Sequence, residues 1–189
     1  MKLRFLVAGV AAGLVALTIA CGSNPVGPTR TGTVSVLLRD SPFSEAKAVL
    51  VSFSEVSVHA SGGGWTTIPF PVDAPRTCDL KQLQAATDVL GTGSLPAGHY
   101  TQVRLTVSSA DLYFANPATG GPCGSVTGTG SKSAVEIPSG QVILNRPFDL
   151  AEGATMQILL DFDGERSINQ LGNGTYRMNP PVINIVSVQ

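Results

Sequence analysis

The sequence of 189 residues has few charged residues, few aromatic residues and only two histidines. Charged residues make up 13% of the chain, aromatic residues make up 6%, and the formal net charge is −1. Because the chain has no basic stripe, we expect no nucleic-acid partner. The sequence also lacks a long amphipathic helical pattern and a repeat of about 20 to 50 residues, which argues against helical bundles and repeat arrays.

Sequence motifs of common enzyme chemistry are also missing. Neither His59 nor His99 accompanies a G-x-S-x-G motif, so no serine has a recognisable activating context. The three glycines at 62–64 are not followed by the Lys-Ser/Thr pair and helix of a phosphate-binding loop, and they predict a turn. We therefore expect two solvated histidines and no enzyme, with an extracytoplasmic hydrolase as the less favoured alternative.

The beginning of the chain has the layout of a secretory signal. Lys2 and Arg4 precede an apolar run over residues 5–20, and Cys21 follows directly. A cysteine at this place resembles the lipobox of bacterial lipoproteins, so we expect residues 1–20 to be a lipoprotein signal peptide and Cys21 to be lipidated. The apolar run is shorter than the roughly 20 residues of a membrane-spanning helix, which makes a retained anchor the second interpretation. Ordinary cleavage with an unmodified Cys21 is the third.

Lipidation at Cys21 predicts a location outside the cytoplasm, at a membrane. Each buried methylene of an acyl chain contributes about 0.8 kcal/mol, and several chains together anchor a protein firmly. Gly22 follows the cysteine in place of aspartate, which in a diderm bacterium resembles lipoproteins sorted to the outer membrane. Loss of Lys2 and Arg4 with the signal changes the net charge from −1 to −3. We expect the membrane as a partner through the anchor, with an envelope protein or a glycan as a further partner.

Residues 21–32 are rich in Pro, Gly, Ser and Thr and predict a tether, and residues 33–189 predict one domain.

The cysteine count agrees with a location outside the cytoplasm. With Cys21 acylated, Cys78 and Cys123 remain as an even pair, which favours a disulfide in an oxidising compartment. Such a bridge closes a loop of about 45 residues and contributes roughly 4 kcal/mol in the chain-entropy model. Free or metal-binding thiols are less favoured, because the sequence has no C-x-x-C spacing.

Many short segments alternate between apolar and polar residues. This two-residue period is typical of strands with one buried face, and turn residues separate the segments. Together they predict an all-β fold, an Ig-like or prealbumin-like antiparallel β-sandwich. The clearest alternations are residues 34–38, 101–108 and 156–162, and shorter separate strands are expected at 111–114, 142–144 and 148–150.

One strand carries a phase change. Val49, Val51 and Phe53 alternate, and the apolar positions then continue at Val56 and Val58. An extra residue in one strand of a pair, a β-bulge, keeps both halves on the same face. The sequence therefore predicts a bulge at residues 54–55.

The mature chain resembles domain of unknown function family 4382. The phrases VLLRDSP, VLVSFSEVSVH, GGGW, LPAGHYTQVRL, IPSG, LDFDGERS and GNGTYRMNP carry the resemblance, in this order. Residues 39–42 read Arg-Asp-Ser-Pro where the family usually has Thr-Asp-Ala-Pro. The LPAGHY turn is also similar to turns of prealbumin-like sandwich domains, in which the tyrosine, here Tyr100, packs at the start of a strand. The family has no established activity, so the resemblance implies a location and a fold rather than a reaction.

Three carboxylates are candidate calcium ligands. Asp161 and Asp163 are two residues apart on one strand and share a face, and Asp40 ends another strand. Calcium takes six to eight oxygen ligands, but no EF-hand spacing is present, so a solvated face balanced by Arg166 is the favoured alternative and no cofactor is expected. The same pair as glycosidase carboxylates is still less favoured, because such enzymes use two separated segments.

Trp65 and Tyr113 are candidate stacking platforms for sugar rings, with packing at the core or an edge as the favoured alternative. Residues 173–175 fit the glycosylation acceptor pattern, which has no role in a bacterial lipoprotein. The sequence as a whole predicts a lipid-anchored extracytoplasmic binding or structural module of the cell envelope, non-enzymatic, acting through loops at one end of the sandwich. The alternative is a carbohydrate-binding accessory lipoprotein that uses Trp65.

Overall fold

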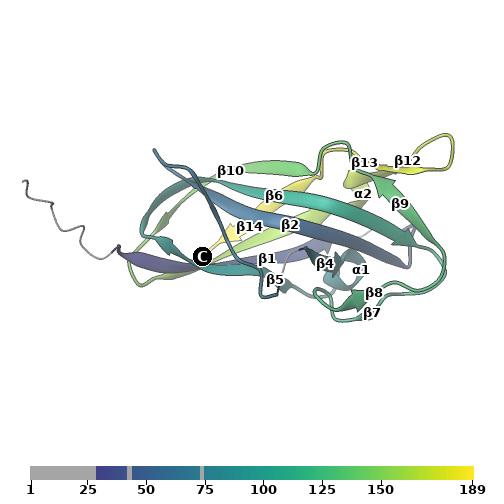
Figure 1. Cartoon of the computed structure of the whole chain (residues 1–189), viewed down its shortest axis with the longest axis horizontal. Helices are drawn as coiled ribbons and strands as arrows, with labels where there is room; N and C mark the ends of the chain where they lie inside the picture. The colour runs from purple at the N-terminus through teal and green to yellow at the C-terminus, as the bar shows by residue number, and fades with distance from the viewer. Residues whose placement is uncertain (1–28, 42–43, 73–74) are drawn as a thin grey trace, which may run out of the picture.

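Strands dominate the computed structural model, which describes residues 29–41, 44–72 and 75–189. Two sheets pack against each other, as Figure 1 shows, and their buried side chains form one large core. The rings of Phe53 and Phe162, from opposite sheets, meet edge to face with centroids 6.3 Å apart. The predicted all-β sandwich is therefore confirmed. The four-stranded sheet contains, in spatial order, β14 (Ile183–Val188), β11 (Thr155–Asp163), β1 (Thr31–Ser41) and β5 (Asp88–Pro96).

The larger sheet has eight strands. Its spatial order is β12 (Ile168–Gln170), β13 (Tyr176–Met178), β9 (Lys132–Glu136), β6 (Gly98–Tyr113), β2 (Ala48–Ala60) and β3 (Trp65–Thr67), while β10 (Gln141–Leu150) also pairs with β6 and β4 (Arg76–Asp79) with β2. A separate pair consists of β7 (Thr119–Gly120) and β8 (Val126–Thr127), and two one-turn helices are α1 (Leu80–Leu83) and α2 (Gly164–Ser167).

Most neighbouring strands are antiparallel, but two pairs are parallel. β1 lies parallel to β11, which places Arg39 beside Asp161, and β13 lies parallel to β9. The prediction of a purely antiparallel sandwich was wrong for these two pairs. The alternation of a strand fixes which residues face the core, but it carries no information on the direction of the neighbouring strand.

The predicted bulge in β2 is confirmed. The pairing of β2 with β6 shifts register on both sides of Phe53, between Ser52 and Glu55. Phe53 and Val56 are consequently both fully buried, although they are three positions apart in the strand. Glu55 is left on the outer face of the sheet, where the candidate binding surface lies.

Two strands are longer than the sequence indicates. Residues 111–114 were expected as a separate strand, but all except Phe114 continue β6 without interruption. Residues 142–144 and 148–150 belong to the single strand β10, which has a register shift between Asn145 and Phe148. Both expectations of separate strands were wrong, because a strand can bend through an irregularity where the alternation lapses, without ending there.

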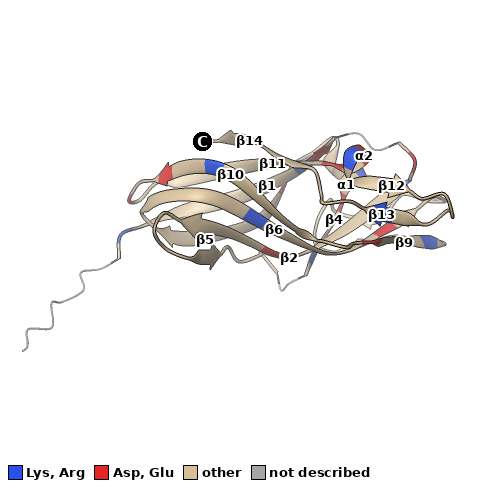
Figure 2. Ribbon diagram, turned by 90° about the horizontal axis from the view of Figure 1, so that it is seen from above, with Lys and Arg blue, Asp and Glu red and all other residues tan. Residues whose placement is uncertain are grey.

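The sandwich is elongated, and its two ends differ. At one end β1 begins, and Arg30 and Thr31 accept backbone hydrogen bonds from Ala97 at 2.7 Å and Gly153 at 2.8 Å. Both helices, β9, β12 and β13 lie toward the opposite end, which we call the helix end (Figure 1). Figure 2 shows charged residues of both signs around α2, β9 and β13.

The expected signal peptide and Cys21 lie outside the described residues, and β1 begins two residues before the expected start of the domain. In the described part of the chain, no helix is long and apolar enough to cross a membrane.

Candidate functional site

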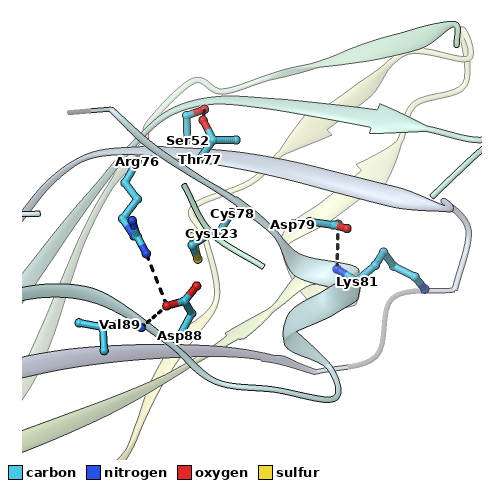
Figure 3. Close-up of a disulfide and its surroundings, with 9 residues drawn as sticks. All are labelled: Ser52, Arg76, Thr77, Cys78, Asp79, Lys81, Asp88, Val89 and Cys123. Atoms are coloured by element: carbon cyan, nitrogen blue, oxygen red, sulfur yellow. Dashed lines mark hydrogen bonds and ion pairs between the residues drawn. A yellow bond between two sulfur atoms is a disulfide. The ribbon is translucent and has the colours of Figure 1, made fainter. Parts of the chain in front are cut away.

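Cys78 and Cys123 form a disulfide, which confirms the prediction from the cysteine count. Cys78 lies in β4 and is fully buried, and the bridge fastens to it the long segment between β6 and β9 (Figure 3). Backbone hydrogen bonds flank the bridge on both sides, from Asp79 to Pro122 at 2.7 Å and from Gly124 to Thr77 at 2.8 Å. The longest connection in the sandwich is therefore held in place.

A buried ion pair stands beside the disulfide. Arg76, only 7% exposed, lies 3.4 Å from Asp88, and the same carboxylate accepts a 2.7 Å hydrogen bond from the backbone of Val89 (Figure 3). The pair joins β4 of the larger sheet to β5 of the smaller one. Both groups have protein partners, so we assign the pair a structural role.

Asp40 is a buried acid near the helix end. It is 6% exposed, and its carboxyl oxygens accept hydrogen bonds from the backbone of Gly164 at 3.1 Å and from the side chain of Gln84 at 3.4 Å. Gly164 is the first residue of α2, and Gln84 is the residue that ends α1. One carboxyl group thus connects both helices to the end of strand β1.

Burial raises the pKa of Asp40 to about 7, because the interior disfavours the charged carboxylate. The hydrogen bonds from Gln84 and Gly164 oppose this rise, and repulsion by the nearby carboxylates of Asp161 and Asp163 adds to it. Near neutral pH the group is divided between its protonated and ionised forms. Neither His59 nor His99 hydrogen-bonds to it, so the structure brings no histidine to this acid for proton transfer.

The structure does not bring the three calcium candidates together as one ligand set. Asp161 and Asp163 share the outer face of β11 as predicted, but Asp40 points to the opposite side, into the core. Asp161 accepts hydrogen bonds from Arg39 at 3.0 Å and Ser41 at 3.2 Å. Asp163 accepts one from the backbone of Arg166 at 3.0 Å and caps α2. Across residues 29–41, 44–72 and 75–189, no three potential metal-binding side chains form a group.

A hollow of about 380 Å³ adjoins this region, between Arg39 and the residues that follow α1. Arg39 lines the hollow, and its side chain is 41% exposed while its guanidinium pairs with Asp161. Gln84 lines the hollow and also donates to Asp40. The region thus combines a buried acid, an ion pair and a shallow hollow, and hydrogen bonds to Asp40 and Asp163 connect the two helices to β1 and β11.

Trp65 belongs to a second cluster of interacting side chains, on the outer face of the larger sheet. The guanidinium carbon of Arg104 stands 4.3 Å from the centre of its ring, and the ring of His59 meets it at 5.1 Å, edge on. Trp65 is only partly buried. Its ring contacts both neighbours, as the edge-packing interpretation predicted, and part of it stays accessible.

Glu55 completes this group. Its Oε1 accepts hydrogen bonds from Arg104 at 2.7 Å and from the Ser57 hydroxyl at 2.9 Å, and Arg104 also donates to Ser57 at 3.1 Å. The hydrogen bonds from Arg104 and Ser57 hold the pKa of Glu55 below its usual value. Sequence analysis missed Glu55 and Arg104, although the bulge in β2 already indicated that Glu55 faces outward.

The other predicted residues have ordinary surroundings. Tyr113 is 9% exposed and packs with Ala48 and Leu50, so its interpretation as a stacking platform was wrong and the packing alternative is confirmed. His99 is exposed and lies 2.7 Å from Asp149. Asn173 accepts a hydrogen bond from the backbone of Thr175 within a turn, where Gly174 adopts φ +81°.

The comparisons with known proteins give one positive result. A family model described as "Domain of unknown function (DUF4382)" matches residues 31–180, which include the disulfide, Asp40, Glu55 and Trp65. No curated protein and no solved structure matches the chain.

Proposed function

Because the chain belongs to the DUF4382 family, whose function is unknown, we propose a function from its own residues. The protein is a lipid-anchored extracytoplasmic binding or structural module of the cell envelope, and it carries out no reaction. The observation that carries this proposal is the Cys78–Cys123 disulfide in a chain that begins with a lipoprotein-like signal.

The disulfide supports the location by its chemistry. Disulfides form and persist in oxidising compartments such as the periplasm and the cell surface, and they are rare in the cytosol. Cys78 is fully buried and Cys123 is partly buried against the core, so the bridge is shielded from reductants on the side of Cys78. A chain whose native fold includes this bridge is suited to a compartment outside the cytoplasm, which agrees with Cys21 as an acylated first residue of the mature protein.

The two ends of the sandwich support a binding role. From Cys21 to Thr31 a chain of ten residues reaches at most about 35 Å. With so short a connection, the end at which β1 begins is the end we expect near the membrane. The helix end lies at the opposite end of the sandwich (Figure 1). The loops of the helix end, braced by the disulfide, are the surface that a partner in the envelope reaches, and loops on a rigid scaffold commonly carry recognition.

The anchor is tested by replacing Cys21 with serine in the natural host. The Cys21→Ser protein is expected in the soluble fraction, whereas the wild type and a Cys78→Ser control that reaches the same compartment stay with the membrane. Membrane retention of Cys21→Ser without an acyl group would contradict the proposal.

A second candidate function is a carbohydrate-binding accessory lipoprotein. The observation that favours it is the partly accessible ring of Trp65 beside Arg104 and Glu55 on an open sheet face. Aromatic rings with neighbouring hydrogen-bonding groups are typical of ligand surfaces. Isothermal titration with soluble polysaccharides is expected to give heat that Trp65→Ala reduces, and an equal heat from the variant would remove Trp65 from the site.

A further inference from the structure

A groove of about 250 Å³ opens at the edge of the larger sheet, at the bulge of β2. β4 pairs with residues 50–53 of β2 and β3 pairs with residues 57–59, so neither strand covers the bulge between them. The chain after β3 forms the far side of the groove. The lining residues are Ser54, Glu55, Thr67, Ile68, Pro69, Phe70 and Val72.

One side of the groove offers hydrogen-bonding groups. The side chain of Glu55 is 35% exposed, and among the described residues only its Oε1 has hydrogen-bond partners, which leaves Oε2 free to accept. Ser54 and Thr67 line the same groove, and both residues are exposed. The Ser54 hydroxyl donates to the carbonyl of Thr106 at 3.4 Å, so it offers a ligand an acceptor. This side therefore presents one fixed carboxylate acceptor, one hydroxyl acceptor and one hydroxyl, that of Thr67, that can donate or accept.

The other side is apolar. Ile68 is almost fully buried and forms its floor, Phe70 is partly buried, and Val72 is 55% exposed. Exposed apolar side chains beside a hollow lose contact with water when a ligand covers them, which stabilises the complex. The groove thus divides into a hydrogen-bonding side and an apolar side.

Charge narrows the class of ligand. The guanidinium of Arg104 lies 2.7 Å from Glu55 and is itself held over the Trp65 ring, so the carboxylate is already neutralised. A cationic ligand would have to compete with Arg104 for the carboxylate. A neutral ligand with hydroxyl groups can donate to the free Oε2 while the ion pair stays intact.

We propose that this groove binds one ring of an oligosaccharide, with ring hydroxyls donating to Glu55 and the C–H face of the sugar against Phe70 and Val72. A sugar ring has the same division into polar and apolar sides as the groove, and the small volume admits a single ring rather than an extended ligand. This inference rests on the second candidate function, and it moves the site from the ring of Trp65 to the groove next to it.

The test uses the full mature protein in detergent on an array of oligosaccharides of hexoses, N-acetylhexosamines and uronic acids. Isothermal titration with the strongest array ligand then measures its affinity for each variant. We expect Glu55→Gln to weaken binding at least about tenfold, which corresponds to the loss of one charge-assisted hydrogen bond. Val72→Ser, at a position that is 55% exposed, is expected to weaken binding severalfold.

Glu136→Gln is the matched control, because Glu136 also pairs with an arginine, Arg177, at 3.2 Å on the outside of a strand, but does not line the groove. It is expected to bind as the wild type does. Absence of binding to every array ligand at millimolar concentration would overturn the proposal, and so would unchanged affinity in Glu55→Gln. Either result is independent of the Cys21→Ser fractionation, so the groove can fail while the anchored module stands.

Discussion

Asp40 and Glu55 are two carboxyl groups of one domain with opposite electrostatic surroundings. Asp40 lies inside the sandwich and accepts hydrogen bonds from two donors, and within the described part of the chain it forms no ion pair; burial raises its pKa to about 7. Glu55 lies on an open sheet face against Arg104, and its pKa is held below the usual value. The first carboxyl titrates near neutral pH, and the second stays ionised there.

The two pKa values shift in opposite directions because the nearest arginine pairs with Glu55 but not with Asp40. Arg39 is the neighbour of Asp40 in sequence, but it projects to the other face of β1 and pairs with Asp161. Arg104 lies on the same face as Glu55 and pairs with it directly. The face of the strand on which each acid lies therefore decides its role. Asp40 accepts hydrogen bonds from both helices in the interior, whereas Glu55 keeps one oxygen free at a groove.

The largest expected effect is a dependence of the free energy of unfolding on pH that comes from Asp40. Between pH 3.8 and about 7 the unfolded carboxyl is ionised while the folded one keeps its proton, so the free energy of unfolding falls as pH rises through this window. A shift of this size corresponds to at most about 4 kcal/mol. Asp40→Asn is expected to remove this fall, which urea unfolding of both proteins from pH 4 to 8 measures. A constant difference in stability between the two proteins across this range would show that the pKa of Asp40 is not raised by folding.

A smaller effect is expected at Glu55. Arg104→Met removes the cation and its hydrogen bond, so the pKa of Glu55 rises toward its ordinary value, as carbon-detected NMR of labelled protein can follow. Because both side chains are partly exposed, the loss in stability is expected to stay below about 1 kcal/mol. Arg177→Met, at the exposed Glu136 pair, is the control and should leave Glu55 unchanged. A Glu55 titration that Arg104→Met does not move would show that the pair has no electrostatic role.

The smallest expected effect is a change in the pKa of Asp40 when the side chain of Gln84 is removed. The hydrogen bond from Gln84 lowers the pKa of this acid against the effect of burial, so Gln84→Ala is expected to raise that pKa slightly further. The same NMR titration measures the change. A fall in the pKa of Asp40 would mean that water enters the space left by the amide and solvates the carboxylate.

Much of the fold was predictable from alternation. The bulge of β2 followed from a phase change at residues 54–55, and the disulfide followed from the cysteine count alone. The burial of Asp40 was also readable, because Val36, Leu38 and Asp40 have the same parity in β1. The parallel pairing of β1 with β11 was not readable, since it joins segments more than a hundred residues apart.

The candidate site was less accessible to sequence reasoning. Glu55 and Arg104 meet because Ser57 pairs with Arg104 in the register of β2 and β6, which the sequence does not specify. The groove needs the chain after β3 to leave the sheet edge. Pro69 and Pro71 indicate a loop there, but they do not indicate that the loop forms one side of a groove. Sequence reasoning therefore found Trp65 but not the neighbours that define its surroundings.

The proposed function requires a domain that folds outside the cytoplasm and carries a lipid anchor at Cys21. The most direct test is mass spectrometry of the protein purified from the membranes of its natural host, without reducing agent. We predict an amino-terminal peptide that begins at an acylated Cys21, together with a peptide pair that joins Cys78 to Cys123. An unmodified Cys21 in a chain that keeps residues 1–20, with both other cysteines open to alkylation, would contradict the account.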